Sequence, residues 1–178
     1  MGKIVVAMYL TLDGVMEEPS WTAPYWDNEI AKFQLDLLFG SDALLLGRVT
    51  YEGFAAAWPA AEDEEGFADR MNKIPKYVAS TTLKRTEWNA RLITSNVAQE
   101  VAKLKKTGQC LLVYGSAELI ETLLKHDLVD ELHLMTFPLV LGEGKRLFKE
   151  NADQKMFNLR DIRSTDSGVL IASYTPDK

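Results

Sequence analysis

The sequence predicts a three-layer α/β fold, with a mostly parallel central sheet, helices on both faces and an antiparallel hairpin at the C-terminus. Short apolar runs of strand length alternate with segments of helical period, which is typical of a parallel sheet. The last two strand-like runs flank Asp166-Ser167-Gly168, a turn that favours a hairpin. The chain has 178 residues, of which 47% are hydrophobic and 26% charged, and it shows neither a repeat nor a linker. We therefore expect one domain over residues 1–178.

The expected strands are apolar runs rich in β-branched side chains and bounded by turn residues. The first of them is continuously apolar, as in a central strand buried on both faces. The expected strands are residues 4–10, 43–46, 76–80, 91–93, 111–114, 131–135, 157–163 and 169–175.

The expected helices follow from apolar side chains at helical spacing. The first begins near Asn28, with Asp27 suited to cap its N-terminus and Gly40 just past its end. A second opens at Gly47 and runs to about Ala57. The remaining helices lie around residues 97–104 and 117–124, and the polar residues 59–69 are expected to form a surface loop or a short irregular helix, with the acidic residues 62–65 as a solvated face.

Composition excludes several classes of function. The formal net charge is −6 and the basic residues are scattered, so we expect no nucleic-acid partner. Cys110 is alone, which excludes an intramolecular disulfide, and no Cys/His spacing predicts a metal site. No apolar run approaches the roughly 20 residues that span a bilayer, and no signal-peptide pattern is present. We expect a cytoplasmic protein with no membrane partner.

Two junctions between a strand and a helix carry glycine, Leu46-Gly47-Arg48 and Tyr114-Gly115-Ser116. Free backbone N–H groups and the positive end of the helix dipole meet at such junctions, so each is suited to a phosphate, and a pair of them to a dinucleotide. Glycine is also common at such places for steric reasons alone. The usual dinucleotide fingerprint is absent, because Gly142-Glu143-Gly144 has no third glycine in place and opens no helix.

The order and spacing of these segments resemble the dihydrofolate reductase-like superfamily. Residues 5–14, 45–52 and 113–119 carry the resemblance, and Gly-Arg-x-Thr at residues 47–50 is the most recognisable piece. Residues 128–132 and 138–148 look like the C-terminal reductase domain of the bifunctional riboflavin-biosynthesis deaminase-reductase. The match covers nearly the whole chain, although the zinc-binding deaminase domain is not part of it.

The resemblance implies that the cofactor is NADPH. The family's phosphate-binding segment matches the first junction, with the arginine favouring the extra phosphate of NADPH. Segments after the third strand and at the second junction match regions that contact the adenosine phosphate, the pyrophosphate and the nicotinamide. The implied cofactor-binding residues are Gly47, Arg48, Val49, Thr50, Ser80, Thr81, Thr82, Tyr114, Gly115, Ser116 and Ala117.

The second junction departs from the family pattern. Relatives often have a Gly-Gly pair there, whose peptide can be cis, whereas here Gly115 precedes Ser116. Because a cis bond before a residue other than proline costs about 3–4 kcal/mol, we do not expect one in this chain.

The substrate side offers several candidates. In dihydrofolate reductases an acid on the first helix donates a proton or anchors the substrate, and alignment through Phe33 brings Glu29 near that position. Glu29 is equally an exposed first-turn acid favoured by the helix dipole, and Asp27 competes for the role. Asp13 either positions the loop beside the nicotinamide or simply belongs to an Asp-Gly turn. The aromatic residues Trp21, Tyr25 and Trp26 either stack on a flat substrate or close the core.

These observations favour an NADPH-dependent reductase of a small heterocyclic substrate, either 5-amino-6-(5-phosphoribosylamino)uracil from riboflavin biosynthesis or a pterin or dihydrofolate-like compound. The alternatives are a non-catalytic nucleotide-binding module that keeps the fold and a purely structural interaction protein. The riboflavin reductase domains tend to pair, so we expect a homodimer. The strands around Leu132 to Val140 are apolar enough to supply the interface, unless they pack entirely within one subunit.

Overall fold

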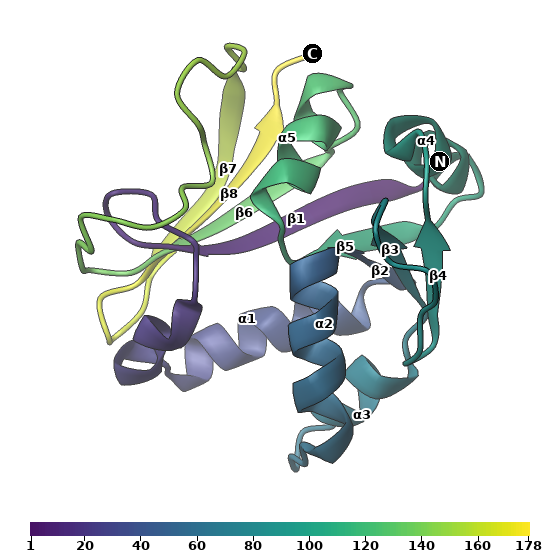
Figure 1. The fold of residues 1–178 in the computed structure, drawn as a ribbon. Coiled ribbons are helices and arrows are strands. Elements are labelled where there is room, and N and C mark those ends of the chain that lie inside the picture. Colours follow the sequence, from purple (N-terminus) through teal and green to yellow (C-terminus); the bar gives the residue numbers. More distant parts are fainter.

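The computed structural model describes residues 1–178 and contains one eight-stranded sheet (Figure 1). The strands are β1 (Lys3–Leu10), β2 (Ala43–Gly47), β3 (Lys76–Ala79), β4 (Ala90–Ile93), β5 (Cys110–Val113), β6 (Glu131–Thr136), β7 (Phe157–Ser164) and β8 (Leu170–Pro176). Their order across the sheet is β4-β3-β2-β5-β1-β6-β8-β7. Neighbours from β4 to β6 are parallel, while β8 pairs antiparallel with β6 and with β7. The predicted fold class and C-terminal hairpin are confirmed.

Three of the five α-helices begin at a residue whose side chain accepts a hydrogen bond from the first turn, namely Asp27, Asn96 and Ser116. Asp27 accepts one from the Ile30 N–H, which confirms it as the cap of the first helix. The helices are α1 (Asn28–Phe39), α2 (Arg48–Ala57), α3 (Phe67–Lys73), α4 (Val97–Lys106) and α5 (Ala117–Lys125), with 3-10 turns η1 (Pro19–Tyr25) and η2 (Trp58–Ala60). None of them combines the length and apolar character that crossing a membrane requires.

The acidic segment 62–65 does more than face solvent. The Asp63 carboxylate accepts hydrogen bonds from the N–H groups of Gly66, Phe67 and Ala68, so it holds the start of α3. Ionised Asp63 is favoured there, and these backbone donors lower the pKa of its carboxyl. The prediction of a solvated face is confirmed, because residues 62–65 are all exposed, and the capping role of Asp63 is an addition that the run of four acids did not reveal.

Alternating side chains of the sheet face two separate cores. Ile4, Val6 and Met8 of β1 pack in the cluster that includes α4 and α5 side chains. Val5 and Ala7 belong to the opposite cluster, which includes side chains of α1, α2 and α3. Both faces of β1 are therefore buried, as its continuous apolar sequence predicts.

The helices that follow two adjacent strands lie on opposite faces of the sheet. α1 follows β1 on one face, whereas α5 follows β5 on the other, and β1 and β5 are hydrogen-bonded neighbours. Helices that diverge in this way open a crevice at the carboxyl ends of the two strands, where ligands bind in open α/β sheets. The topology therefore places a binding site beyond Leu10 and Val113.

The strand β6 lies inside the sheet, between β1 and β8. Leu132, Met135 and Phe137 are each no more than 2% exposed, so they pack within the subunit and offer no surface to a partner. Packing within one subunit, which the sequence left open as the alternative, therefore fits β6 itself, whereas Val140 beyond its end is 64% exposed. The exposed apolar side chains at this end of the molecule are Met156, Leu159, Ile162 and Leu170 on and beside the hairpin, with Val140 and Leu141 in a preceding loop.

Candidate functional site

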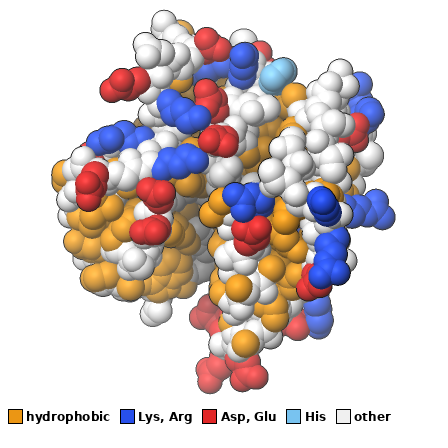
Figure 2. Space-filling view, viewed as in Figure 1, with side chains coloured by type: hydrophobic (Ala, Val, Ile, Leu, Met, Phe, Trp, Pro, Cys, Tyr) orange, Lys and Arg blue, Asp and Glu red, His pale blue; other side chains and the backbone are white.

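A cleft of about 1160 Å³ opens at the carboxyl ends of β1 to β5. Figure 2 shows the surface hollowed between the apolar lobe at the left, where η1 lies, and the column of side chains over α2. Ordinary small-molecule sites occupy about 300–1,000 Å³. The cleft therefore has room for a dinucleotide together with a second small ligand.

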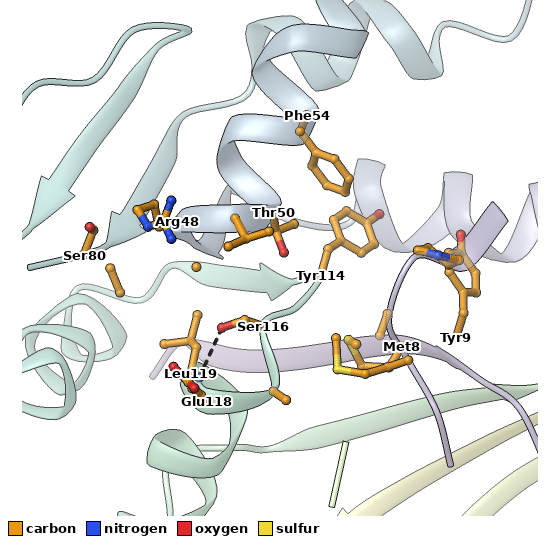
Figure 3. A pocket seen from close by; sticks show the side chains of 18 of the residues that line it. Met8, Tyr9, Arg48, Thr50, Phe54, Ser80, Tyr114, Ser116, Glu118 and Leu119 are labelled. Carbon is orange, nitrogen blue, oxygen red and sulfur yellow. Dashed lines mark hydrogen bonds between the residues drawn. The ribbon is translucent and has the colours of Figure 1, made fainter. Parts of the chain in front are cut away.

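The two glycine junctions pack directly against each other along the cleft. A Cβ on Gly47 would lie 2.5 Å from the Ser116 Oγ, and a Cβ on Gly115, whose φ is +102°, would lie 3.0 Å from the Thr50 Oγ1. Side chains at these positions would push the junctions apart. Glycine is therefore required at both positions by the packing of the junctions as well as by local turn geometry. The close contact between the junctions brings the starts of α2 and α5 together (Figure 3).

The N-terminus of α2 has backbone donors without a capping side chain. Its N-cap is Gly47, which has no side-chain hydrogen bond to offer. The N–H groups of the first turn, which includes Arg48, Val49 and Thr50, therefore face the cleft side of the junction without a local acceptor. By contrast, Ser116 caps α5 by accepting from the Leu119 N–H at 3.4 Å. The α2 terminus is the better anion site of the two.

The peptide bond between Gly115 and Ser116 is cis. The sequence-based expectation of a trans bond is therefore wrong. That expectation used the preference of an isolated peptide bond and took no account of the surrounding packed junctions.

Arg48 lies at the entrance of the junctions and is free to change partners. Its guanidinium contacts the Glu52 carboxylate at 2.9 Å, one turn along α2, and both side chains are nearly half exposed. Pairs of this kind stabilise a protein by only about 0.3–0.5 kcal/mol. A phosphate group can replace Glu52 at little cost.

Hydroxyl-bearing loops after β3 and β4 border the same end of the cleft. Ser80 is buried, and its Oγ accepts from the N–H groups of Thr82 and Leu83 at 3.2 and 3.1 Å, so it shapes the loop that presents Thr81 and Thr82. Thr94, Ser95 and Asn96 after β4 also line the cleft. The sequence analysis missed this second loop, although polar residues directly after a predicted strand were a usable signal.

All the predicted cofactor-binding residues except Gly115 line the cleft, and Gly115 supports it from behind through Thr50. We call this region the junction end. It consists of residues 47–50, 80–82, 94–96 and 116–117.

The other end of the cleft is aromatic, and of its residues only Trp26 and Tyr114 were predicted to belong to the site. The Phe54 ring packs edge-on against Trp58 and Tyr114, with ring centroids 6.5 and 6.1 Å apart, and Trp26 packs against Tyr9 at 5.9 Å. Figure 3 shows Tyr9, Phe54 and Tyr114 at one side of the view and Arg48 and Ser80 at the other. We call this region the aromatic end. It consists of Tyr9, Trp26, Gln34, Phe54, Trp58 and Tyr114.

The aromatic end contains polar atoms that are buried. The Gln34 side chain donates from Nε2 to the Tyr9 hydroxyl at 2.8 Å, while its Oε1 has no hydrogen-bond partner. The Tyr114 hydroxyl also has none. Burial raises the pKa of both Tyr9 and Tyr114 far above the ordinary range, so both phenols stay protonated. This end is therefore polar at defined atoms but uncharged.

The three aromatic residues proposed for the substrate divide between two roles. Trp26 is 44% exposed and lines the cleft. Trp21 and Tyr25 do not line it, and both pack edge-on against the buried Phe137, with ring centroids 5.5 and 6.0 Å away. The sequence left open whether these residues stack on a substrate or close the core. Trp21 and Tyr25 close the core, and only Trp26 faces the cleft.

The acidic candidates lie outside the cleft. Glu29 is exposed in the first turn of α1, whose cleft-lining side chains are Ala31 and Gln34 instead. Asp27 is occupied as the helix cap and accepts from the Ser167 hydroxyl at 2.7 Å. A proton from Glu29 would have to travel to the cleft through water.

Asp13 ties together two loops. Its carboxylate accepts from the Gly142 N–H at 2.8 Å and the Leu141 N–H at 3.3 Å, besides the Thr11 hydroxyl. The Thr11 hydroxyl and the Gly142 N–H lower the pKa of Asp13 to about 2. An acid this strong is unsuited to donating a proton near neutral pH, and the geometry fits a positioning role. No group of three or more His, Cys, Asp or Glu side chains is arranged to hold a metal ion.

Comparison with known proteins identifies relatives over the whole chain. The family model described as RibD C-terminal domain matches residues 2–171. The uncharacterized protein YyaP of Bacillus subtilis (strain 168) is 34% identical over 179 residues, which cover 97% of this chain and 94% of that protein. The uncharacterized protein YwjB of the same organism is 24% identical over 172 residues, covering 95% of each chain.

Solved structures share the fold at low sequence identity. A putative riboflavin biosynthesis protein from Shewanella sp. PV-4 superposes with a TM-score of 0.82 at 22% identity and full coverage of both chains. The riboflavin biosynthesis reductase Rib7 of Saccharomyces cerevisiae has a TM-score of 0.63 at 17% identity, covering 99% of this chain and 90% of its own. Dihydrofolate reductase from Enterococcus faecalis, solved with NADP(H), has a TM-score of 0.63 at 14% identity, covering 99% and 98%. The fold is therefore dihydrofolate reductase-like, and the resemblance seen in the sequence is confirmed.

Proposed function

The chain belongs to the RibD C-terminal domain family, and from this premise we propose that it is an NADPH-dependent reductase of a small heterocyclic substrate. The observation that carries the proposal is the contact between the two glycine junctions. It gathers the uncapped N-terminus of α2, Arg48 and the hydroxyl-bearing loops at one end of a cleft long enough for a dinucleotide. A solved structural neighbour of the same fold holds NADP(H).

The residues present fit NADPH. The first-turn amides of α2 suit the pyrophosphate, and Arg48 with Thr81 and Thr82 suits the additional phosphate. When bound, NADPH would supply the hydride. The chain's own task is then to hold the two ligands in contact and to exclude water, for which the aromatic end is suited.

Two compounds are candidates for the substrate. The names of structural neighbours favour 5-amino-6-(5-phosphoribosylamino)uracil, which a Thermotoga maritima neighbour is described as reducing, or a dihydrofolate-like compound. Glu29 as proton donor stays a prediction, since its carboxylate lies outside the cleft lining.

The first experiment is a fluorescence titration of the protein with NADPH and with NADH. We expect NADPH to bind more tightly, and Arg48→Ala to weaken NADPH binding about tenfold while leaving NADH nearly unchanged, because one charge-assisted contact to a phosphate is lost. Arg91→Ala is the matched control, since Arg91 is exposed on the edge strand β4 and does not line the cleft. No detectable binding at millimolar NADPH would refute the proposal.

A second candidate, a nucleotide-binding module without catalysis, has one observation in its favour. No carboxylate lies at the aromatic end, where a reductase is expected to protonate its substrate. NADPH that binds tightly but is not oxidised with any pyrimidine or pterin tested would support this candidate.

We also propose that the protein is a homodimer. β7 forms one edge of the sheet and leaves Leu159 and Ile162 exposed, and Leu170 on β8 lies beside them in the hairpin. Unpaired edges with apolar side chains favour association. Sedimentation velocity should give a dimer at micromolar concentration and a monomer for Ile162→Glu. A monomeric wild type would remove the proposal.

A further inference from the structure

The aromatic end holds hydrogen-bonding capacity that the protein itself does not use. The Gln34 residue is 2% exposed, and its Oε1 is buried without a partner. The buried Tyr114 hydroxyl has no partner either. Buried polar atoms are nearly always hydrogen-bonded, because leaving them unpaired costs stability. Both residues line one cleft, so we infer that a ligand in the cleft completes these two atoms.

Met135 and Tyr9 fix which atom of Gln34 is free. The Gln34 Nε2 lies 3.7 Å from the Met135 sulfur and 2.8 Å from the Tyr9 hydroxyl oxygen. A thioether sulfur accepts hydrogen bonds and cannot donate, so it favours the NH₂ group of the amide. Oε1 is then the unpaired acceptor. Tyr9 is a positioning residue, because its hydroxyl holds the amide in place, while the Met135 sulfur selects its orientation.

The free groups are one acceptor, Gln34 Oε1, and one donor, the Tyr114 O–H. The ionisable side chains that line the cleft, apart from the two tyrosines, are Glu17, Glu18, Arg48, Asp63, Glu65, Glu118 and Lys145, and all of them are exposed at the rim. The inner groups are therefore suited to a ligand that is uncharged where it enters and that offers one donor and one acceptor.

We propose that Gln34 and Tyr114 bind the edge of an uncharged amide, with Gln34 Oε1 accepting from its N–H and the Tyr114 hydroxyl donating to its C=O. The inference rests on the proposed function, because both sources of such an edge belong to that reaction. One source is a ring amide of the substrate, and the other is the carboxamide of the nicotinamide. Gln34 would then determine specificity for an uncharged ring. A carboxylate at the same position would instead select a protonated or cationic ring.

Two pairs of probes separate the sources. Uracil offers ring amide edges, whereas 1,3-dimethyluracil has the same ring without any N–H. NADPH carries a carboxamide, whereas its 3-acetylpyridine analogue carries a methyl ketone without an N–H. Binding of each probe is measured by calorimetry, for uracil with and without NADPH, on the wild type, Gln34→Leu and Tyr114→Phe. Gln154→Leu is the control, since it makes the same change at an exposed position outside the cleft.

If the substrate supplies the amide, the wild type binds uracil about tenfold more tightly than dimethyluracil, and Gln34→Leu loses this preference. Tyr114→Phe instead weakens the binding of both probes, because each of them keeps the C=O to which Tyr114 donates. If the cofactor supplies it, the same loss of preference appears between NADPH and its acetylpyridine analogue. The Gln154→Leu control keeps the wild-type preference in either case. Circular dichroism melting curves establish that each variant is folded.

The inference is overturned if neither pair of probes is discriminated by the wild type, if Gln34→Leu keeps a discrimination that the wild type shows, or if Tyr114→Phe binds all probes as tightly as the wild type does. The experiment gives a different result if the proposed reductase function itself is wrong. In that case NADPH does not bind the wild type at all, while the uracil arm without cofactor still reports on Gln34 and Tyr114.

Discussion

The two ends of the cleft are built in different ways. The junction end consists of backbone at the starts of α2 and α5 together with the loops after β3 and β4, each contained in a few consecutive residues. The aromatic end consists of side chains from β1, α1, α2 and the end of β5, and its key contact joins Tyr9 to Gln34 across 25 positions of the sequence. The proposed phosphate site thus combines segments that are each local in sequence, whereas the proposed site of the second ligand depends on single side chains from several elements.

This difference explains what each end tolerates. A backbone site depends on the absence of side chains at particular glycines, so adding a methyl group damages it. A site made of side chains depends on the presence of particular polar atoms, so deleting an atom damages it. The following predictions test the contrast, starting from the largest expected effect.

Gly47→Ala should damage the junction end most. The new Cβ would lie 2.5 Å from the Ser116 Oγ, so the two junctions must separate. Overpacking of this kind costs about 1–3 kcal/mol, and we expect NADPH affinity to fall about tenfold or more. The measurements are thermal unfolding and the NADPH titration.

Gly53→Ala is the matched control on the same helix. Gly53 also lines the cleft, but a Cβ there meets no atom within 4 Å. Since alanine is the better helix former, the variant should be about 0.5–1 kcal/mol more stable and should bind NADPH as the wild type does. Equal losses in the two variants would show that the close approach of the junctions is not the cause.

Tyr51→Phe and Tyr114→Phe should change stability in opposite directions. The Tyr51 hydroxyl accepts from the Glu87 N–H at 2.8 Å and donates to the Glu87 carbonyl at 3.2 Å, so its removal leaves backbone groups unpaired and costs about 1–3 kcal/mol. The Tyr114 hydroxyl has no partner to lose, and removing it should leave the unliganded protein as stable or more stable. Chemical denaturation of both variants measures the difference. Equal destabilisation would mean that Tyr114 is already paired in the free protein.

Asp13→Asn should have the smallest effect and a pH dependence. The pKa of Asp13 falls from 3.8 to about 2 on folding, so the folded protein binds this proton more weakly than the unfolded chain. The stabilisation is complete above pH 4 and is lost as the pH falls through 2. The melting temperature of the variant should be lower than that of the wild type at pH 7, and the gap should close between pH 4 and pH 2. A gap that persists at pH 2 would assign it to the shape of the side chain instead of its charge.

Most of the architecture could be predicted from the sequence because its signals are local. Strand runs, the Asp27 cap, the hairpin turn and the two glycine junctions all appear in the structure where they were expected. The start of α3 was missed because Asp63 is one of four consecutive acids, and only the fold shows which of them caps the helix.

Apart from Trp26 and Tyr114, the residues of the aromatic end could not be predicted, for a similar reason. Gln34 reads as an ordinary polar position in an amphipathic helix, and only the packing of β1 and β6 against α1 buries it. Glu29 was chosen by alignment through Phe33, but the side chain of Phe33 packs on His133 at 5.5 Å and the face of α1 toward the cleft is set by Ala31 and Gln34. Gln34 lies five residues, or about 1.4 helical turns, beyond Glu29, so the two side chains project from different faces of α1.

The position of β5 in the sheet also sets when this protein can fold during its synthesis. β5 lies between β1 and β2, although it follows both by more than 60 residues in the chain. A nascent chain that ends before Cys110 therefore lacks the central strand that joins the two halves of the sheet and carries the second junction. Such non-local strand pairing is slow and leaves apolar surface exposed until it is complete. The first two thirds of the chain should therefore leave the ribosome without a finished core.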